Sequence, residues 1–173
     1  MGVASYPFPP KRSTDGRIEV RFCAYEARMS HWILEPVVIR TRDGAAVLSL
    51  DGTGWDGDIP PTFPAPDRVE LHLRRYPDGN TRYDLFVDVE SERCWLAGTE
   101  GEASDTSGAE TVLEGAYARQ VEATAPDLLA QGLCPYCQAQ LYGSWLHRRL
   151  GRKRVKCLVC ARTWQLPPGA QLN

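Results

Sequence analysis

Cys134-Pro-Tyr-Cys137, followed after nineteen residues by Cys157-Leu-Val-Cys160, is the stretch that decides the local fold at the C-terminal end of this 173-residue chain. Each pair of cysteines can form a tight turn that offers two thiolates from one side. Four thiolates complete a closed tetrahedral shell, which is the coordination that a structural zinc ion prefers. The spacing therefore predicts one structural Zn²⁺ held by Cys134, Cys137, Cys157 and Cys160.

The residues between and after the two pairs fit a small hairpin. The apolar residues of 141–146 lead away from the first pair, Gly151 can make the turn, and Val155 leads into the second pair. Residues 163–166 supply a closing strand. A segment of about 40 residues buries too little apolar surface to fold alone, so we expect the metal to supply its stability.

Residues 134–166 resemble the C4 zinc-ribbon family, and the four cysteines match the four ligands of that family one by one. The resemblance implies two metal-binding knuckles at the ends of a small antiparallel sheet. In many ribbons a glycine follows the second cysteine of each pair, whereas this chain has Gln138 and Ala161 there. A residue other than glycine at positive φ costs about 1 kcal/mol. Gln138 and Ala161 are therefore expected to affect the backbone geometry of the turns, and the identity of the four ligands is unchanged.

The sequence Cys134-Pro-Tyr-Cys137 is also similar to the active-site motif of the glutaredoxin family. In that family the motif follows an early strand of a thioredoxin-like domain of about 100 residues, whereas here only 36 residues follow Cys137. This position favours zinc binding. A thiol redox protein that uses Cys134 and Cys137 is kept as an alternative.

Charge is distributed unevenly along the chain. Residues 1–133 carry thirteen basic and twenty-two acidic residues, a net charge of −9, while residues 134–173 carry seven basic residues and no acidic one. Six cationic residues lie within 147–156, and aromatic residues near them can stack on bases, a pattern typical of nucleic-acid surfaces. The residues predicted to contact nucleic acid or another partner are Trp145, Arg148, Arg149, Arg152, Lys153, Arg154 and Lys156. The competing interpretation is a solvated hairpin, or one that contacts the acidic part of the same chain.

The first part of the chain has the alternating pattern of antiparallel strands. Residues 1–15 are expected to be a flexible N-terminal segment, and residues 16–97 an antiparallel β domain of five or six strands. Apolar and polar residues alternate from Ile18 onward, and residues 69–89 form the clearest hairpin. Residues 51–66 are rich in Gly, Pro and Asp, which predicts a long loop.

Three further segments complete the predicted domain organisation. Residues 98–109 are small, polar and acidic, which indicates a linker or loop. Residues 110–132 have helical periodicity and form a helical connector, in which Pro126 is expected to break the helix or begin a short second one. Residues 133–168 form the C4 zinc ribbon. The predicted fold class is α+β, mainly β.

No sequence pattern supports catalysis. The chain has no phosphate-binding loop, nucleophile elbow, metalloprotease helix or dinucleotide motif. His31 and His72 lie in predicted strands without partners that the sequence identifies, and no small-molecule substrate is evident. We therefore expect a non-catalytic protein.

The apolar runs and the charge distribution of the sequence also predict where the protein is located and what it binds. No apolar run approaches the roughly 20 residues that span a bilayer, and the N-terminus lacks the apolar core of a signal peptide, so we expect a cytoplasmic protein with no membrane partner. The favoured function is contact with nucleic acid, or with a complex that contains it, through the basic ribbon. The alternative is a protein-binding inhibitor, similar to bacterial immunity proteins, that acts through the acidic β domain.

Overall fold

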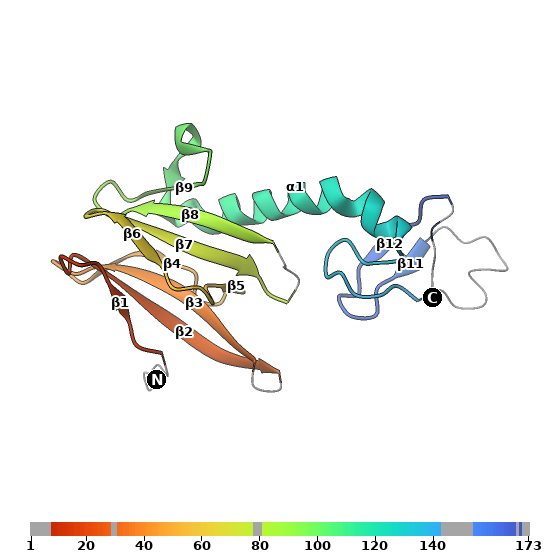
Figure 1. Ribbon diagram of the computed structural model, residues 1–173, viewed down its shortest axis with the longest axis horizontal. Coiled ribbons are helices and arrows are strands. Elements are labelled where there is room, and N and C mark those ends of the chain that lie inside the picture. The colour runs from red at the N-terminus through yellow and green to blue at the C-terminus, as the bar shows by residue number, and fades with distance from the viewer. Residues whose placement is uncertain (1–7, 29–30, 78–80, 143–153, 169, 171–173) are drawn as a thin grey trace. The chain divides into compact units, whose positions relative to one another are not determined.

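The computed structural model describes residues 8–28, 31–77, 81–142, 154–168 and 170. The chain divides into two compact units, Met1–Glu114 and Gly115–Asn173. The first contains two antiparallel sheets, of four and six strands among the described residues, so the prediction of five or six strands in all was too low. The second contains most of the helix and a two-stranded sheet (Figure 1). This confirms the predicted α+β class, in which antiparallel strands predominate.

The first sheet has four strands in the order β1-β2-β3-β4. The long hairpin of β2 and β3 dominates it, in register from Ile18 opposite Arg40 to Arg28 opposite His31. The alternation that begins at Ile18 is thus confirmed as a strand. The strands are β1 (Lys11–Arg12), β2 (Ile18–Arg28), β3 (His31–Arg40) and β4 (Ala45–Ser49).

The second sheet has the order β10-β9-β8-β7-β5, with β6 also paired to β7. Its centre is the hairpin predicted for residues 69–89, in which Leu71 lies opposite Leu85 and Val69 opposite Val87. These four side chains are buried because alternate residues of the two strands point into the core. The strands are β5 (Trp55–Asp56), β6 (Thr62–Ala65), β7 (Arg68–Arg75), β8 (Arg82–Asp88), β9 (Arg93–Leu96) and β10 (Ser104–Asp105).

Two segments expected to be loops contribute strands to this second sheet. The prediction of a long loop over 51–66 was wrong in part, because β5 and β6 within it both pair with β7. The segment 98–109, expected as a linker or loop, contains the 3₁₀ helices η1 (Glu100–Glu102) and η2 (Thr106–Gly108), with β10 between them paired to β9. In both cases the strands are short and lack alternation, so their sequence carries no strand signal.

Two buried carboxylates hold the segment around β5 in place. Glu35 is 1% exposed and accepts hydrogen bonds from the N–H groups of Gly52 (2.6 Å) and Gly54 (2.5 Å). Asp56 is fully buried and accepts one from the N–H of Leu34 (2.9 Å). Because a buried carboxylate without partners is costly, these bonds fix the backbone of the segment.

The helix α1 (Ala109–Ala130) is continuous, which corrects the prediction that Pro126 ends it. Proline removes one backbone N–H, so the helix loses a single hydrogen bond at this point and continues for four further residues. Its first turns belong to the first unit, where Leu113 is buried and the Glu114 carboxylate lies 2.8 Å from Arg75 Nε and 3.1 Å from Trp55 Nε1. Within the described residues, no helix is both long and apolar enough to cross a membrane.

Candidate metal centre

The first pair of cysteines lies in a tight turn after the helix. The N–H of Gln138 donates to the carbonyl of Cys134 (2.7 Å), and the N–H of Cys134 donates to the carbonyl of Ala139 (2.8 Å). Leu133 and Gln140 form an antiparallel bridge that closes the base of the turn. Cys134 and Cys137 are thereby presented from one side, as the C-x₂-C spacing predicts.

The second pair repeats this turn after the strand β11 (Arg154–Lys156). The N–H of Ala161 donates to the carbonyl of Cys157 (3.0 Å), and the N–H of Cys157 donates to the carbonyl of Arg162 (2.8 Å). The closing strand predicted for residues 163–166 is present as β12 (Thr163–Gln165), paired antiparallel to β11. Residues 143–153, which include the predicted turn at Gly151, lie outside the described part of the chain.

Both positions where many ribbons carry glycine have positive φ. Gln138 has φ 53° and Ala161 has φ 61°. The backbone therefore adopts the left-handed conformation expected of these turns, although neither residue is glycine. Both turns are regular, since their hydrogen bonds match, although Gln138 and Ala161 stand where many ribbons have glycine.

The four sulfur atoms converge. Cys134 Sγ lies 3.6 Å from Cys160 Sγ, Cys137 Sγ lies 3.5 Å from Cys157 Sγ, and all four lie within 4.8 Å of one another. A zinc ion with Zn–S bonds near 2.3 Å separates its tetrahedral sulfurs by roughly 3.8 Å. All four cysteines are free thiols, so the arrangement is that of a ligand set and not of disulfides.

The donor set fits a closed structural metal site. Cys134 and Cys157 are buried, while Cys137 and Cys160 are half-buried. Four sulfur donors suit Zn²⁺ and leave no position for water or substrate. The four cysteines are therefore able to hold a metal ion whose chemical contribution is to hold the two turns together.

The surroundings of the thiols raise the pKa of two cysteines and lower the pKa of a third. Burial raises the pKa of Cys137, and burial likewise raises the pKa of Cys160. At Cys157 burial opposes ionisation, but hydrogen bonds from the N–H groups of Cys160 and Val159 outweigh it and lower the pKa to about 7. Backbone donors aimed at a sulfur stabilise its thiolate, which is the form that binds metal.

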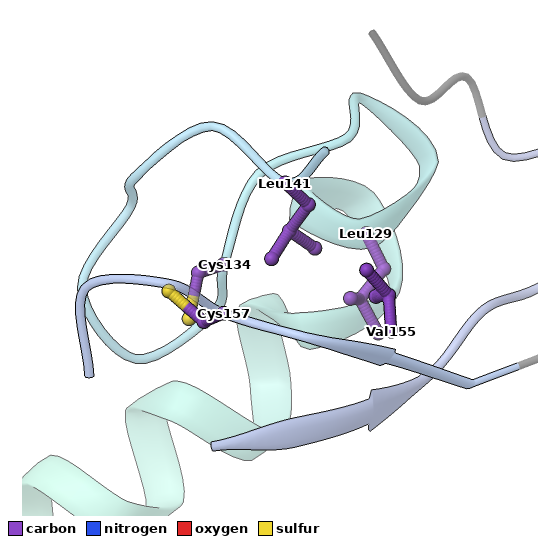
Figure 2. Packing of buried hydrophobic residues seen from close by; sticks show 5 residues of the cluster. All are labelled: Leu129, Cys134, Leu141, Val155 and Cys157. Carbon is purple, nitrogen blue, oxygen red and sulfur yellow. The ribbon is translucent and has the colours of Figure 1, made fainter. Parts of the chain in front are cut away.

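The apolar core of this unit surrounds the ligands. Leu129, Leu141 and Val155 pack together, and the sulfurs of Cys134 and Cys157 lie side by side next to them (Figure 2). Leu129 comes from α1, so the end of the helix belongs to the ribbon core. The helix segment predicted as a connector therefore contributes directly to the packing around the metal ligands.

Further contacts of the same unit were not predicted from the sequence. The Tyr117 hydroxyl donates to the carbonyl of Tyr136 (2.6 Å), and their rings meet edge to face at 5.3 Å. The Arg162 guanidinium lies 3.5 Å from the centre of the Tyr136 ring. Trp164 Nε1 donates to Cys134 Sγ (3.1 Å). The residues of each pair are 19 to 30 positions apart in sequence, so no local sequence pattern predicts these contacts.

The predicted partner-binding residues are described only in part. Arg154 and Lys156 are exposed on one face of β11, with the buried Val155 between them. We call Arg154 and Lys156 the cationic strand face. Trp145, Arg148, Arg149, Arg152 and Lys153 lie outside the described residues.

The geometry favours metal binding over the redox alternative. A thiol–disulfide catalyst needs an accessible thiol of low pKa, and the proposed pair was Cys134 with Cys137. Cys134 is fully buried, and the pKa of Cys137 is raised by burial. Both thiols also share their surroundings with a second pair of cysteines, which a redox pair does not require.

No family model matches the chain, and neither does any curated protein or solved structure. The assignment of the four cysteines as metal ligands therefore rests on their own geometry. Two turns with matching hydrogen bonds and four convergent sulfurs are the observations that carry it.

Proposed function

We propose that this protein binds one structural zinc ion through Cys134, Cys137, Cys157 and Cys160, and that the ribbon so formed contacts nucleic acid. The zinc assignment is supported by four sulfurs within 4.8 Å of one another. The contact with nucleic acid is supported by the charge of the ribbon, because residues 134–173 include seven basic and no acidic residues.

The strand geometry supports a cationic contact surface. Arg154 and Lys156 are exposed on the same side of β11, two residues or roughly 7 Å apart along the strand, so both can contact the phosphates of one nucleic-acid strand. Arg162 is also exposed and lies over the ring of Tyr136. Tyr142, 57% exposed, offers an aromatic surface on which a base can stack.

Salt-dependent binding tests this proposal. Fluorescence anisotropy of a labelled single-stranded RNA, and of a DNA of the same sequence, is measured with the zinc-loaded full chain at several salt concentrations. We expect affinity to fall steeply with salt, because each neutralised phosphate releases a counterion. The double variant Arg154→Ala/Lys156→Ala should bind more weakly and show a salt slope lower by about 1.4, or about 0.7 per lost contact on a single strand.

A charge-matched control comes from the β domain. The variant Lys11→Ala/Arg17→Ala removes two exposed basic residues and should leave both affinity and salt slope unchanged. Absence of binding at low salt would contradict the nucleic-acid proposal, as would equal losses in the two double variants.

The acidic β domain gives weaker support to the inhibitor alternative than its composition indicates. Several of its carboxylates are paired with arginines of the same unit, such as Asp56 with Arg74 and Asp58 with Arg82. Glu19 similarly pairs with Arg12 and Arg21. The number of unpaired carboxylates is therefore smaller than the twenty-two acidic residues of 1–133, although the net charge stays at −9.

A further inference from the structure

Three side chains with metal-binding groups meet on the second sheet, far in sequence from the cysteines. Glu70 and His72 are two residues apart on β7, so both point to the face opposite the buried Val69, Leu71 and Leu73. Asp84 of β8 lies directly across from His72 in the register of the hairpin. The three therefore share one face of two adjacent strands.

Their ligand atoms converge. His72 Nδ1 and Asp84 Oδ1 share a hydrogen bond of 2.8 Å, and one ligand atom from each of Glu70, His72 and Asp84 lies within 4.8 Å of the others. The Thr62 hydroxyl donates to Glu70 Oε2 (2.6 Å), which fixes this carboxylate from the neighbouring strand β6 and leaves its other oxygen as an acceptor. Ligands held on paired strands are positioned before a cation arrives, which lowers the entropic cost of binding.

The local charge suits a cation. Two carboxylates stand beside one imidazole, and two basic residues near them, Arg74 and Arg82, have carboxylate partners. A third, Arg68, lies over the ring of Trp95, 4.9 Å from its centre. Arg74 donates to the buried Asp56 through Nε (3.0 Å) and Nη2 (2.8 Å), while Arg82 donates to Asp58 (2.5 Å). These ion pairs offset the positive charge that would otherwise repel a metal ion.

The cluster is open to solvent. The His72 side chain is 19% exposed and the Asp84 side chain is 45% exposed, so a hydrated ion can reach them. Three protein ligands leave at least one coordination position for water. This distinguishes the cluster from the closed set of four cysteines.

We propose that Glu70, His72 and Asp84 form a second metal site, which takes a divalent transition-metal ion of the Zn²⁺ type. An imidazole nitrogen with carboxylate oxygens suits zinc and its neighbours, whereas Ca²⁺ and Mg²⁺ prefer oxygen ligands alone. The site is independent of the proposed contact between the ribbon and nucleic acid.

Titration of Zn²⁺ into the full chain, already loaded with one equivalent of zinc, tests the site by calorimetry. We expect one further equivalent to bind. His72→Ala and Glu70→Gln should each weaken this second equivalent at least about tenfold, since each removes a ligand. His31→Ala is the matched control, because it removes a histidine from the other sheet, and it should bind the second equivalent like the unchanged protein.

Co²⁺ added to the zinc-loaded protein identifies the ligand type. We expect weak visible bands without a thiolate charge-transfer band, and their loss in Glu70→Gln. This isosteric variant keeps the test decisive if His72→Ala folds poorly. The proposal is overturned if zinc-loaded protein takes up no second ion, or if the second ion binds equally to Glu70→Gln and the unchanged protein.

Discussion

The indole nitrogen of Trp164 donates a hydrogen bond to the sulfur of Cys134 across 3.1 Å. A donor aimed at a ligand sulfur stabilises its thiolate and fixes its direction, so Trp164 supports the metal centre from outside the ligand set. The pairing of β12 with β11, in which Trp164 lies opposite Val155, sets the position of the indole.

Trp164→Phe should weaken zinc binding about tenfold, because phenylalanine keeps the apolar ring but has no N–H to donate. Competition with a chromophoric chelator measures the change. Trp32→Phe, at an exposed tryptophan of β3, is the control and should leave the zinc affinity unchanged. Equal affinities of Trp164→Phe and the unchanged protein would show that the hydrogen bond is unimportant for the metal.

Cys157→Ser should abolish stoichiometric zinc binding and unfold the ribbon, because it removes one of four ligands and a buried residue of the ribbon core. The two β sheets should persist, since they have a core of their own. Elemental analysis gives the zinc content, and hydrogen exchange reports on the two units separately. Cys23→Ser is the control and should retain one zinc per chain; full zinc in Cys157→Ser would refute the four-thiolate assignment.

Ala161→Gly should tighten zinc binding by about 1 kcal/mol, or roughly fivefold, because glycine adopts positive φ without the clash that alanine suffers. Chelator competition provides the measurement. Ala139→Gly is the comparison, since Ala139 packs against the ribbon core and its φ is not positive. That change should weaken binding, and a gain there equal to the gain at position 161 would refute the backbone argument.

The apparent zinc affinity should rise with pH between 6 and 8. Because burial raises the pKa of Cys137 and of Cys160 above the ordinary thiol value of 9.0, both groups hold protons throughout this range, and metal binding must displace them. Each displaced proton contributes about tenfold per pH unit, so Cys137 and Cys160 together contribute about a hundredfold per pH unit, and Cys157, with its pKa of about 7, adds to the dependence below pH 7. Competition with a chelator of known pH dependence checks this, and a flat profile would contradict it.

Asp56→Asn should destabilise the β domain by about 3 kcal/mol, because it removes the buried counter-charge of the partly buried Arg74 guanidinium, which then keeps the more exposed Asp58 at 3.5 Å. Urea unfolding followed by tryptophan fluorescence gives the free energy of unfolding. Asp58→Asn, at a carboxylate that is 30% exposed, is the matched control and should cost less than about 1 kcal/mol. Similar losses in both variants would mean that burial of the pair is not what matters.

The sequence predicts the elements whose signal is local. Alternation from Ile18 and from Val69 gives β2 and β7, because a strand buries every second residue. The C-x₂-C spacing likewise predicts the four metal ligands, because the turn geometry is contained within a few residues. The positive φ of Gln138 and Ala161 follows from the same turn.

Features that depend on tertiary contacts escaped prediction. Strand β10 is only Ser104 and Asp105, and it exists because the edge of β9 offers it backbone partners. Pro126 signals a helix end, yet the helix continues, and Leu129 beyond it packs into the ribbon core. The sequence marks Glu70 and His72 as polar-face residues, but their proximity to Asp84 depends on the register of the hairpin.

Two of the five buried residues in the ribbon core, Cys134 and Cys157, are also candidate metal ligands. If the ribbon folds only when its thiolates bind zinc, the fraction of chains that present the cationic strand face follows the free zinc concentration by mass action. The extent of the proposed nucleic-acid binding would then depend on the free zinc concentration. In zinc-starved conditions the chain would keep its β sheets while losing the surface proposed here to contact nucleic acid.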